Sequence, residues 1–383
     1  MRLADRVLIT GGAGFIGSHT CDALLARGYE VRVLDSLQPR VHPRGRPRYL
    51  SSAVDFHQGD VRDPLAWQRA LDGVRIVFHL AAYQDYMPDF STFLHVNAVS
   101  TALLYELIVG NCYPVQKIIL ASSQSVYGEG HYGCETHGVF SPGPRTLEQL
   151  ERGLWEHLCP DCSCPSRPIP LEESFAHPQT AYGISKFAAE QLGLQLGRRY
   201  GIPTVALRYS IVQGPRNSLF NAYSGICRTF AKRILNGHPP IVYEDGLQLR
   251  DYVHVRDVVA AHLLFLESNA GNFEAFNVAG QRSVSVLEFA GIVNEQCGRF
   301  LSPVLHGEFR VGDPRHTVSD SSKLRRLGWA PRHSVEEIVA DYVNWLREQG
   351  EVCDNSDAAF AEMQRHGVLR RAAASAGSQA VRR

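Results

Sequence analysis

The chain has 383 residues, of which 44% are hydrophobic, and its 39 lysines and arginines balance 39 aspartates and glutamates. This length predicts two domains or one large α/β unit, and the zero net charge argues against a general nucleic-acid or acidic-membrane binder. We find no apolar run near the roughly 18 residues that a membrane span needs. The N-terminus lacks a signal-peptide pattern, and nine cysteines, an odd number, do not resemble a secreted disulfide framework. We therefore expect a cytoplasmic protein.

The N-terminal part of the chain alternates short apolar runs with helical patterns. Residues 6–10 form an apolar run, a glycine turn and a helical pattern follow, and a second apolar run covers 31–35. Further apolar runs at 76–82 and 117–122 flank a helical pattern at 97–109. Repeated βα units of this kind predict an α/β protein with a doubly wound parallel sheet of the Rossmann type.

The alternation stops in the middle of the chain. Residues 129–173 contain Gly, Pro, Cys and His without a clear period, which predicts an irregular insert that is functional or mobile. A helical pattern resumes at 182–200 and a strand pattern at 204–209. The shorter elements that follow suit a smaller C-terminal lobe packed against the sheet.

The glycine turn has the spacing Gly11-x-x-Gly14-x-x-Gly17 between a predicted strand and a predicted helix. Glycines there allow a tight turn and bring a pyrophosphate close to the helix N-terminus. Asp35 ends the next predicted strand, where a carboxylate accepts ribose hydroxyls and repels a 2′-phosphate, so NAD is favoured over NADP. Four arginines that follow keep NADP open as an alternative: Arg40, Arg44, Arg46 and Arg48.

Tyr182 and Lys186 lie one helical turn apart at the start of the pattern at 182–200. A phenol with a pKa near 10 must lose about 3 pKa units, or roughly 4 kcal/mol, to act as a base at neutral pH. A lysine charge and a positive nicotinamide ring could supply this shift together. A core tyrosine beside a solvated lysine is the alternative. Ser123, at the carboxyl end of a predicted parallel strand, would point into the ligand crevice and hydrogen-bond a substrate oxygen.

Together these motifs resemble the extended short-chain dehydrogenase/reductases, and more narrowly the nucleotide-sugar epimerase/dehydratase family. The segments that carry the resemblance are 10–17, 79–82, Ser123 with 126–128, Tyr182 with Lys186, and 250–255. It implies NAD as cofactor, a nucleotide-sugar substrate and a homodimer. It also implies that Tyr182 is the base, that Lys186 binds the nicotinamide ribose, and that Ser123 holds the reacting oxygen.

The resemblance assigns further residues to the two ligands. Cofactor contacts are expected from Gly11, Gly14, Phe15, Ile16, Gly17, Asp35, Asp60, Val61, Leu80, Ala81, Ala82, Asn97, Tyr182 and Lys186. Substrate contacts are expected from Gln124, Ser125, Asn221, Arg250, Arg310 and Asp313. The implied domains are an NAD-binding Rossmann domain over 1–208 with the insert at about 129–173, a mainly substrate-binding lobe over 209–350 with segments returning to the first domain, and a partly disordered tail over 351–383.

Two departures from the family pattern narrow the reaction. Dehydratases of the family carry an Asp-Glu pair where this chain has Gln124 and Ser125, which cannot eliminate water by acid and base catalysis. What remains is epimerisation through oxidation at C4, a 4-keto intermediate and hydride return to the opposite face. A related oxidoreductase or dehydratase and a catalytically silent NAD-binding protein are the alternatives. Residues 214–226 resemble bacterial 4-epimerases of dTDP-6-deoxyhexoses. Ile211 replaces an asparagine usual in the family, and Gln84 replaces a lysine of UDP-galactose 4-epimerases; both changes argue against an ordinary UDP-hexose substrate.

Four cysteines are concentrated in the insert. Cys159 and Cys162 have the C-x-x-C spacing of a zinc knuckle, and Cys134 and Cys164 could complete a tetrahedral site. A structural zinc ion would explain how a loop rich in Pro and Gly holds its shape without a core. Because a second C-x-x-C is absent, a reduced metal-free loop and redox or disulfide chemistry stay open.

Overall fold

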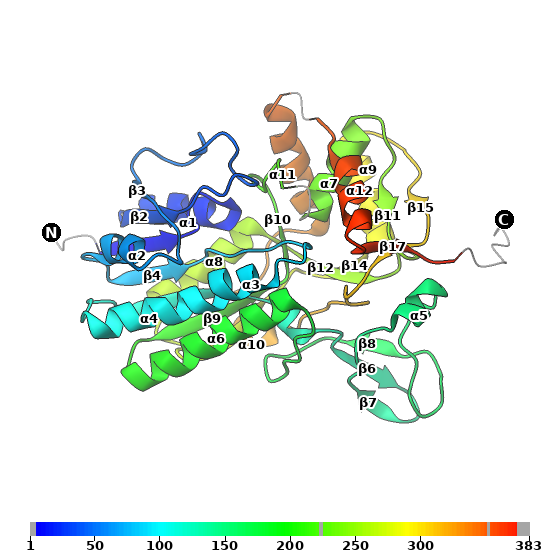
Figure 1. The fold of residues 1–383 in the computed structure, drawn as a ribbon, viewed down its shortest axis with the longest axis horizontal. Helices are drawn as coiled ribbons and strands as arrows, with labels where there is room; N and C mark the ends of the chain where they lie inside the picture. The colour runs from blue at the N-terminus through cyan, green and yellow to red at the C-terminus, as the bar shows by residue number, and fades with distance from the viewer. Residues whose placement is uncertain (1–4, 222–224, 351–352, 374–383) are drawn as a thin grey trace.

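The computed structural model describes residues 5–221, 225–350 and 353–373. A seven-stranded sheet with the order β13-β9-β5-β4-β1-β2-β3 forms its centre, and every neighbouring pair is parallel (Figure 1). Its strands are β1 (Arg6–Thr10), β2 (Glu30–Asp35), β3 (Asp55–Gln58), β4 (Ile76–His79), β5 (Lys117–Ser123), β9 (Thr204–Tyr209) and β13 (Glu274–Val278). The predicted Rossmann-type α/β fold is confirmed.

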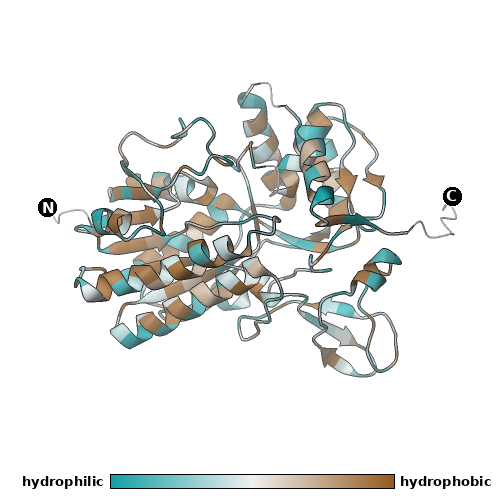
Figure 2. Cartoon of the chain, viewed as in Figure 1, coloured by the Kyte–Doolittle hydropathy of each residue, from teal (hydrophilic) through white to brown (hydrophobic). Residues whose placement is uncertain are grey.

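Apolar side chains on both faces of the sheet explain this arrangement. Within β1, Val7 and Ile9 pack on one face and Leu8 packs on the other, so the strand is buried on both sides. Figure 2 shows the central strands in the colour of hydrophobic residues. The first face is covered by α1 (Phe15–Leu25) and α8 (Val255–Glu267), and the second by α2 (Pro64–Leu71), α4 (Ser100–Gly110) and α6 (Ala181–Tyr200).

One continuous helical stretch, Phe90–Gly110, is long and apolar enough by composition to cross a membrane, contrary to the expectation from the sequence. It consists of α3 (Phe90–Phe93), the π-helical turn η1 (Leu94–Val99) and α4. Half of its most apolar part is buried inside the protein, and α3, η1 and α4 all contact α6. Because a core helix passes the same test, its length and composition are weak evidence of a membrane span.

The second lobe follows β9 in sequence. Its core joins α7 (Ile226–Leu235), α9 (Val286–Cys297) and α11 (Val335–Glu348) to strands β12 (Leu249–His254) and β14 (Ser283–Ser285). β12 also pairs with β10 (Ile211–Gln213), and a separate pair is formed by β11 (Ile241–Val242) and β15 (Val304–Leu305). The chain returns to the first lobe through α8, β13 and the short α10 (Ser322–Arg325).

The tail expected to be partly disordered is ordered over its described part. Residues 353–373 contain α12 (Ser356–Arg365) and β17 (Leu369–Arg371), which pairs antiparallel with β16 (Glu308–Arg310). Ala359 and Met363, one helical turn apart, are buried and attach α12 to the second lobe. The rest of the expected tail, 374–383, lies outside the described residues.

The insert is also more regular than its sequence predicts. After the 3₁₀ turn η2 (Gln124–Tyr127), β6 (His131–Cys134) pairs antiparallel with β7 (Gly138–Phe140) and β8 (Arg167–Ile169). The helix α5 (Leu147–Glu151) lies between β7 and β8 in sequence. This small sheet projects from the body of the molecule below the second lobe in Figure 1.

Candidate active site

A cavity of about 1030 Å³ lies at the carboxyl ends of the central strands, between the sheet and the second lobe. In an open α/β sheet this edge is where ligands bind. All the predicted cofactor and substrate residues except Asn97 and Lys186 line it.

The glycine turn brings backbone close to backbone at one end of this cavity. Gly11 has a φ of +69°, and a Cβ there would lie 2.8 Å from the Cα of Ala81. A Cβ on Gly17 would lie 2.3 Å from the Gly11 carbonyl oxygen. No side chain caps the N-terminus of α1 at Gly14, and the first turn of the helix lines the cavity. Free amides at a helix N-terminus fit the pyrophosphate of a dinucleotide such as NAD.

The two carboxylates predicted for the cofactor site, Asp35 and Asp60, already accept hydrogen bonds from other residues of the chain. The Asp35 carboxylate accepts hydrogen bonds from the backbone amides of Ala13 (2.9 Å) and Leu37 (2.8 Å), and its burial raises the pKa of this group. Each oxygen keeps a second lone pair for a ribose hydroxyl. Asp60 also lines the cavity, where hydrogen bonds from Arg62 hold the pKa of its carboxyl below the usual value.

Asn97 lies behind the cavity rather than in its wall. It sits in the π-helical turn η1, where its side-chain amide donates to Ser185 Oγ (2.9 Å) on α6 and to the Tyr83 carbonyl (3.0 Å). Its side-chain oxygen accepts a hydrogen bond from the Tyr83 amide. Asn97 therefore ties the segment after β4 to the helix that carries Tyr182, and π-helical turns of this kind are frequent at functional sites.

Ser123 and Tyr182 meet because α6 approaches η2 very closely. Ser123 is the last residue of β5, and Tyr182 is in the first turn of α6, which begins after the N-cap Thr180. A Cβ on Gly183 would lie 2.4 Å from the Ser125 carbonyl oxygen, so only glycine permits this contact. Both side chains line the cavity, where Ser123 Oγ lies 3.1 Å from Ser125 Oγ and also acts on the Tyr182 phenol.

Burial shifts the pKa values of both Tyr182 and Lys186. Burial raises the pKa of Tyr182 to about 12, although the hydrogen bond with Ser123 opposes this shift. The Lys186 ammonium donates to the Ala121 carbonyl (2.8 Å), and burial lowers the pKa of Lys186 to about 8. Because burial disfavours the charged form of each group, the phenol needs a further positive charge, such as that of a nicotinamide ring, to become a base.

The predicted substrate residues lie on the other side of the cavity. The Arg310 guanidinium lies 4.1 Å from the Tyr86 ring centre and 5.4 Å from that of Tyr243, and it forms an ion pair with Asp313 (2.6 Å). Arg250 instead donates to backbone carbonyls of Pro314 (3.0 Å) and Arg315 (2.8 Å). The main role of Arg250 in this structure is therefore to hold the loop in place, and a contact with the substrate would be an additional role.

Sequence reasoning missed one wall of the cavity, which the tail supplies. The residues concerned are Phe360, Met363, His366, Gly367 and Val368. The helical spacing of Ala359 and Met363 was the only signal that this segment packs against the lobe, and it was hidden by a composition typical of disorder.

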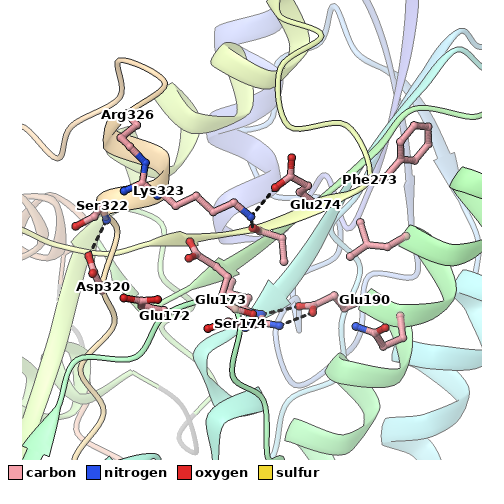
Figure 3. Close-up of a pocket in the computed structure, with 14 residues that line it drawn as sticks. Glu172, Glu173, Ser174, Glu190, Phe273, Glu274, Asp320, Ser322, Lys323 and Arg326 are labelled. Atoms are coloured by element: carbon pink, nitrogen blue, oxygen red, sulfur yellow. Dashed lines mark hydrogen bonds and ion pairs between the residues drawn. The ribbon is translucent and has the colours of Figure 1, made fainter.

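A second cavity, of about 430 Å³, opens beside α6 at the opposite face of β9 and β13 (Figure 3). Two ion pairs occupy its wall: Lys323 bonds Glu274 (2.9 Å), and Arg208 bonds Glu190 (2.7 Å). It contains none of the predicted catalytic residues. We therefore assign the chemistry to the larger cavity.

The cysteine set predicted for zinc is corrected in one member. The structure brings Cys134, Cys159 and Cys162 together with His137, whereas Cys164 is exposed outside this group. His137 is three residues after Cys134, a spacing that repeats that of Cys159 and Cys162. This repeat was the signal that could have identified the fourth residue.

The parallel sheet, the glycine turn and the Ser–Tyr–Lys group define a dinucleotide-dependent protein of the short-chain dehydrogenase/reductase type. The pattern of the NAD dependent epimerase/dehydratase family matches residues 7–146 and 161–279. The chain therefore belongs to this family, as its motifs predicted. Residues 147–160, in the insert, are passed over by the match.

Known relatives are similar along nearly the whole chain. The dTDP-L-rhamnose 4-epimerase of Burkholderia thailandensis is 32% identical over 352 residues, covering 90% of this chain and 95% of the relative. The UDP-glucose 4-epimerase of Thermotoga maritima, solved with UDP-glucose, is 30% identical with a TM-score of 0.73 and coverages of 90% and 100%. That of Thermus thermophilus, solved with NAD, is 30% identical with a TM-score of 0.69 and coverages of 89% and 99%. The expectation of an NAD-dependent nucleotide-sugar epimerase is confirmed.

Proposed function

We propose that this enzyme interconverts the two C4 epimers of a dTDP-activated 6-deoxyhexose, with Ser123 and Tyr182 acting on the oxygen at C4. The observation that carries this assignment is that Ser123 and Tyr182 line one cavity together with the glycine turn. Gln124 and Ser125 line the same cavity and carry no acid or base for elimination of water.

The proton at the C4 hydroxyl would move to the Tyr182 phenolate, while the Ser123 hydroxyl donates a hydrogen bond to the same oxygen. NAD bound in this cavity would supply the acceptor and donor of the C4 hydride and a positive charge beside the phenol. Tyr182 then gives the proton back to the C4 oxygen after the sugar has turned its other face. Lys186, whose ammonium is fixed by the Ala121 carbonyl, would hold the ribose at this position.

The nucleotide end of the substrate would bind among Tyr86, Tyr243 and Arg310. A guanidinium held between two aromatic rings is suited to a diphosphate and to a stacked base. At the sugar end, the Gln124 side chain is buried, and its Oε1 has no partner among the described residues. A buried acceptor without a partner favours a ligand hydroxyl at this place.

Three features favour a dTDP-6-deoxyhexose over a UDP-hexose. The Burkholderia relative is named as a dTDP-L-rhamnose 4-epimerase, and its alignment, with 32% identity, covers 90% of this chain. Gln84 and Ile211 line the cavity at two positions where UDP-hexose epimerases carry a lysine and an asparagine. The asparagine that family members usually carry at the Ile211 position often meets the substrate diphosphate, so its replacement argues against an ordinary UDP-hexose.

The assignment is tested by a panel of dTDP-, UDP- and GDP-sugars, with products identified by NMR. We expect the fastest turnover with a dTDP-6-deoxyhexose and no net change in NADH absorbance. A substrate carrying deuterium at C4 should keep its label with inverted configuration. Stoichiometric reduction of NAD would instead identify an oxidoreductase, and faster turnover of a UDP-hexose would contradict the substrate class.

The enzyme is proposed to act in the cytoplasm as a homodimer. Large apolar side chains are exposed on the Phe90–Gly110 helix and on the adjacent α6; they are Phe90, Leu94, Val99, Val109 and Ile184. A second copy of the same helices would cover them. Sedimentation equilibrium should give twice the chain mass, and Val99→Glu should reduce it to a single mass. A monomeric wild type, or one that needs detergent, would contradict the dimer.

A further inference from the structure

The turns that begin at Cys134 and Cys159 have the same local structure. In each turn, the backbone amides two and three residues after the cysteine hydrogen-bond to its sulfur. The donors are Thr136 and His137 for Cys134, and Asp161 and Cys162 for Cys159. Such amide bonds stabilise and orient a sulfur ligand of a metal. Each turn also presents a second possible ligand at the third position, namely His137 and Cys162.

The four ligand atoms form a compact group of the size of one metal site. The Sγ atoms of Cys134 and Cys162 are 3.7 Å apart. His137 Nδ1 lies 3.7 Å from the Cys134 sulfur and 3.5 Å from the Cys159 sulfur. A tetrahedral zinc ion sets sulfur–sulfur and sulfur–nitrogen separations of about 3.8 and about 3.6 Å. All four atoms lie within 4.8 Å of one another.

The insert has little else to hold its outer part together. Its strands have only 4, 3 and 3 residues. A sheet this small is not stable in water without further packing. The apolar cluster beside it consists of Val126, Tyr127 and Leu171, which lie where the insert joins the body. Zinc-finger peptides fold only when they bind their metal, so a metal ion can take the place of a core.

The metal-ligand cluster adjoins a buried network of charges between the insert and the second lobe. His157, two residues before Cys159, lies 3.0 Å from the Glu129 carboxylate. Glu129 in turn accepts a hydrogen bond from the Arg315 backbone amide (2.8 Å). The fully buried Arg315 side chain bonds Glu156 from the insert and Glu244 from the lobe. Buried ion pairs of this kind depend on accurate geometry, because an unpaired buried charge is very costly.

This network reaches the loop that lines the nucleotide end of the cavity. The Arg145 guanidinium, in the insert, bonds the Glu244 carboxylate (2.9 Å) and the backbone carbonyl of Asp313 (2.8 Å). Residues 310–314 belong to the cavity wall. A displaced insert would therefore release the loop that carries Arg310 and Asp313.

We propose that Cys134, His137, Cys159 and Cys162 bind one structural Zn²⁺ ion, which holds the insert against the 310–315 loop and so shapes the nucleotide subsite. Three thiolates and one imidazole fill all four positions of a tetrahedral zinc ion. The site is closed to substrate and takes no part in the hydride chemistry. The role of the insert in nucleotide binding rests on the proposed function, whereas the metal site itself does not.

The ligand set is tested by elemental analysis of the full chain, expressed in zinc-supplemented medium and purified without a metal-affinity column. We expect about one zinc per chain in the wild type. Cys134→Ser and His137→Gln should lose it. Cys164→Ser, two residues beyond Cys162, is the matched control and should retain it. Wild type without zinc would overturn the proposal, as would loss of zinc in Cys164→Ser together with retention in His137→Gln.

Cobalt provides a second measurement if the ligand variants do not fold. Wild type expressed with Co²⁺ should show the intense visible bands of tetrahedral cobalt and the near-ultraviolet absorption of thiolate ligands. A cobalt-free protein, or the weak spectrum of octahedral cobalt, would overturn the site.

The role of the ion is tested with dTDP and UDP as probes. Calorimetric titration before and after removal of the metal by a chelator should show about tenfold weaker binding of the nucleoside diphosphate. The amount of NAD that co-purifies should stay the same, because the cofactor contacts lie on the central sheet. Unchanged nucleotide affinity in zinc-free protein would exclude the supporting role, even where the metal analysis finds the ion.

Discussion

The cofactor half of the molecule and the insert are stabilised in different ways. Around the central sheet, apolar side chains from strands and helices fill both faces, and the glycine turn needs only backbone to approach backbone. The insert meets the second lobe through Glu129, Arg145 and Arg315, all buried, with a Cys/His group at its outer end. Apolar packing tolerates small shifts, whereas buried charges do not. The comparison predicts that a substitution in one region changes the property that depends on that region and leaves the other region folded.

The largest effect is expected from Tyr182→Phe in the cofactor half. Loss of the proton acceptor should lower kcat by about 10³–10⁴-fold, near the upper range for general acid–base groups. NAD should remain bound, because the ring and the glycine turn are unchanged. Tyr200→Phe, at the exposed end of the same helix, is the control. Epimerisation by Tyr182→Phe at a normal rate, measured by NMR, would refute Tyr182 as the base.

The interface of the insert should be the most sensitive part for stability. Arg315→Met removes the buried guanidinium that pairs with Glu156, Glu244 and Asp245 and leaves Glu244 with Arg145 alone, which should cost about 3–5 kcal/mol of unfolding free energy. Arg152→Met, which breaks an exposed pair with Glu148 in the same insert, should cost less than about 1 kcal/mol. Denaturant titration compares the two variants, and equal costs would show that the buried network is not a stabilising feature.

The second lobe and the insert should respond to pH with opposite signs. Burial raises the pKa of Asp251, in β12, to about 7, so its contribution is present at low pH and is lost as pH rises from about 4 to about 7. Burial also acts on Glu156, in the insert, but bonds from His316 and Arg315 lower its pKa to about 2. Its contribution is present above pH 4.5 and is lost as pH falls towards 2.

Asp251→Asn and Glu156→Gln separate these contributions. Asp251→Asn should remove up to about 4 kcal/mol of the change in unfolding free energy between pH 4 and 7. Glu156→Gln should change only the acidic side of the profile. Profiles of both variants that run parallel to the wild type would show that neither carboxyl group has a shifted pKa.

The smallest effect is expected at the sugar. Gln124→Leu removes an acceptor of a sugar hydroxyl, which is worth about 1.5 kcal/mol, or roughly tenfold in KM. The value of kcat should change little, since the leucine fills the same volume beside Ser123. A kcat as low as that of Tyr182→Phe would instead place Gln124 in the chemical step.

The sequence was sufficient for the parts of the fold that local patterns encode. The glycine spacing at 11–17 and the pair Tyr182 and Lys186 are local, and the structure brings them to one edge of the sheet. His137 was not recognised as a partner of the cysteines, because an imidazole in a loop has many ordinary roles. The contribution of β17 depends on pairing with β16, about sixty residues away in sequence, which no local pattern reveals.

The shifts in pKa could not be predicted from the sequence either. The helical spacing of Tyr182 and Lys186 places the pair on one face, but only the structure shows that the ammonium donates to the Ala121 carbonyl. Desolvation depends on the packing of the whole surroundings rather than on neighbours in sequence. Proximity in a motif is therefore not enough to deduce the sign of a pKa shift.

The missing side chain at Gly183 has a consequence for protein engineering. Because a single methyl group there would collide with the Ser125 carbonyl, the distance between Ser123 and Tyr182 leaves no room for variation. Libraries that seek new sugar specificity should leave 122–125 and 180–186 intact. Diversity belongs at cavity-lining positions outside the buried charge network, such as Ile211, Phe360 and His366, which directed evolution can alter independently of the reacting groups.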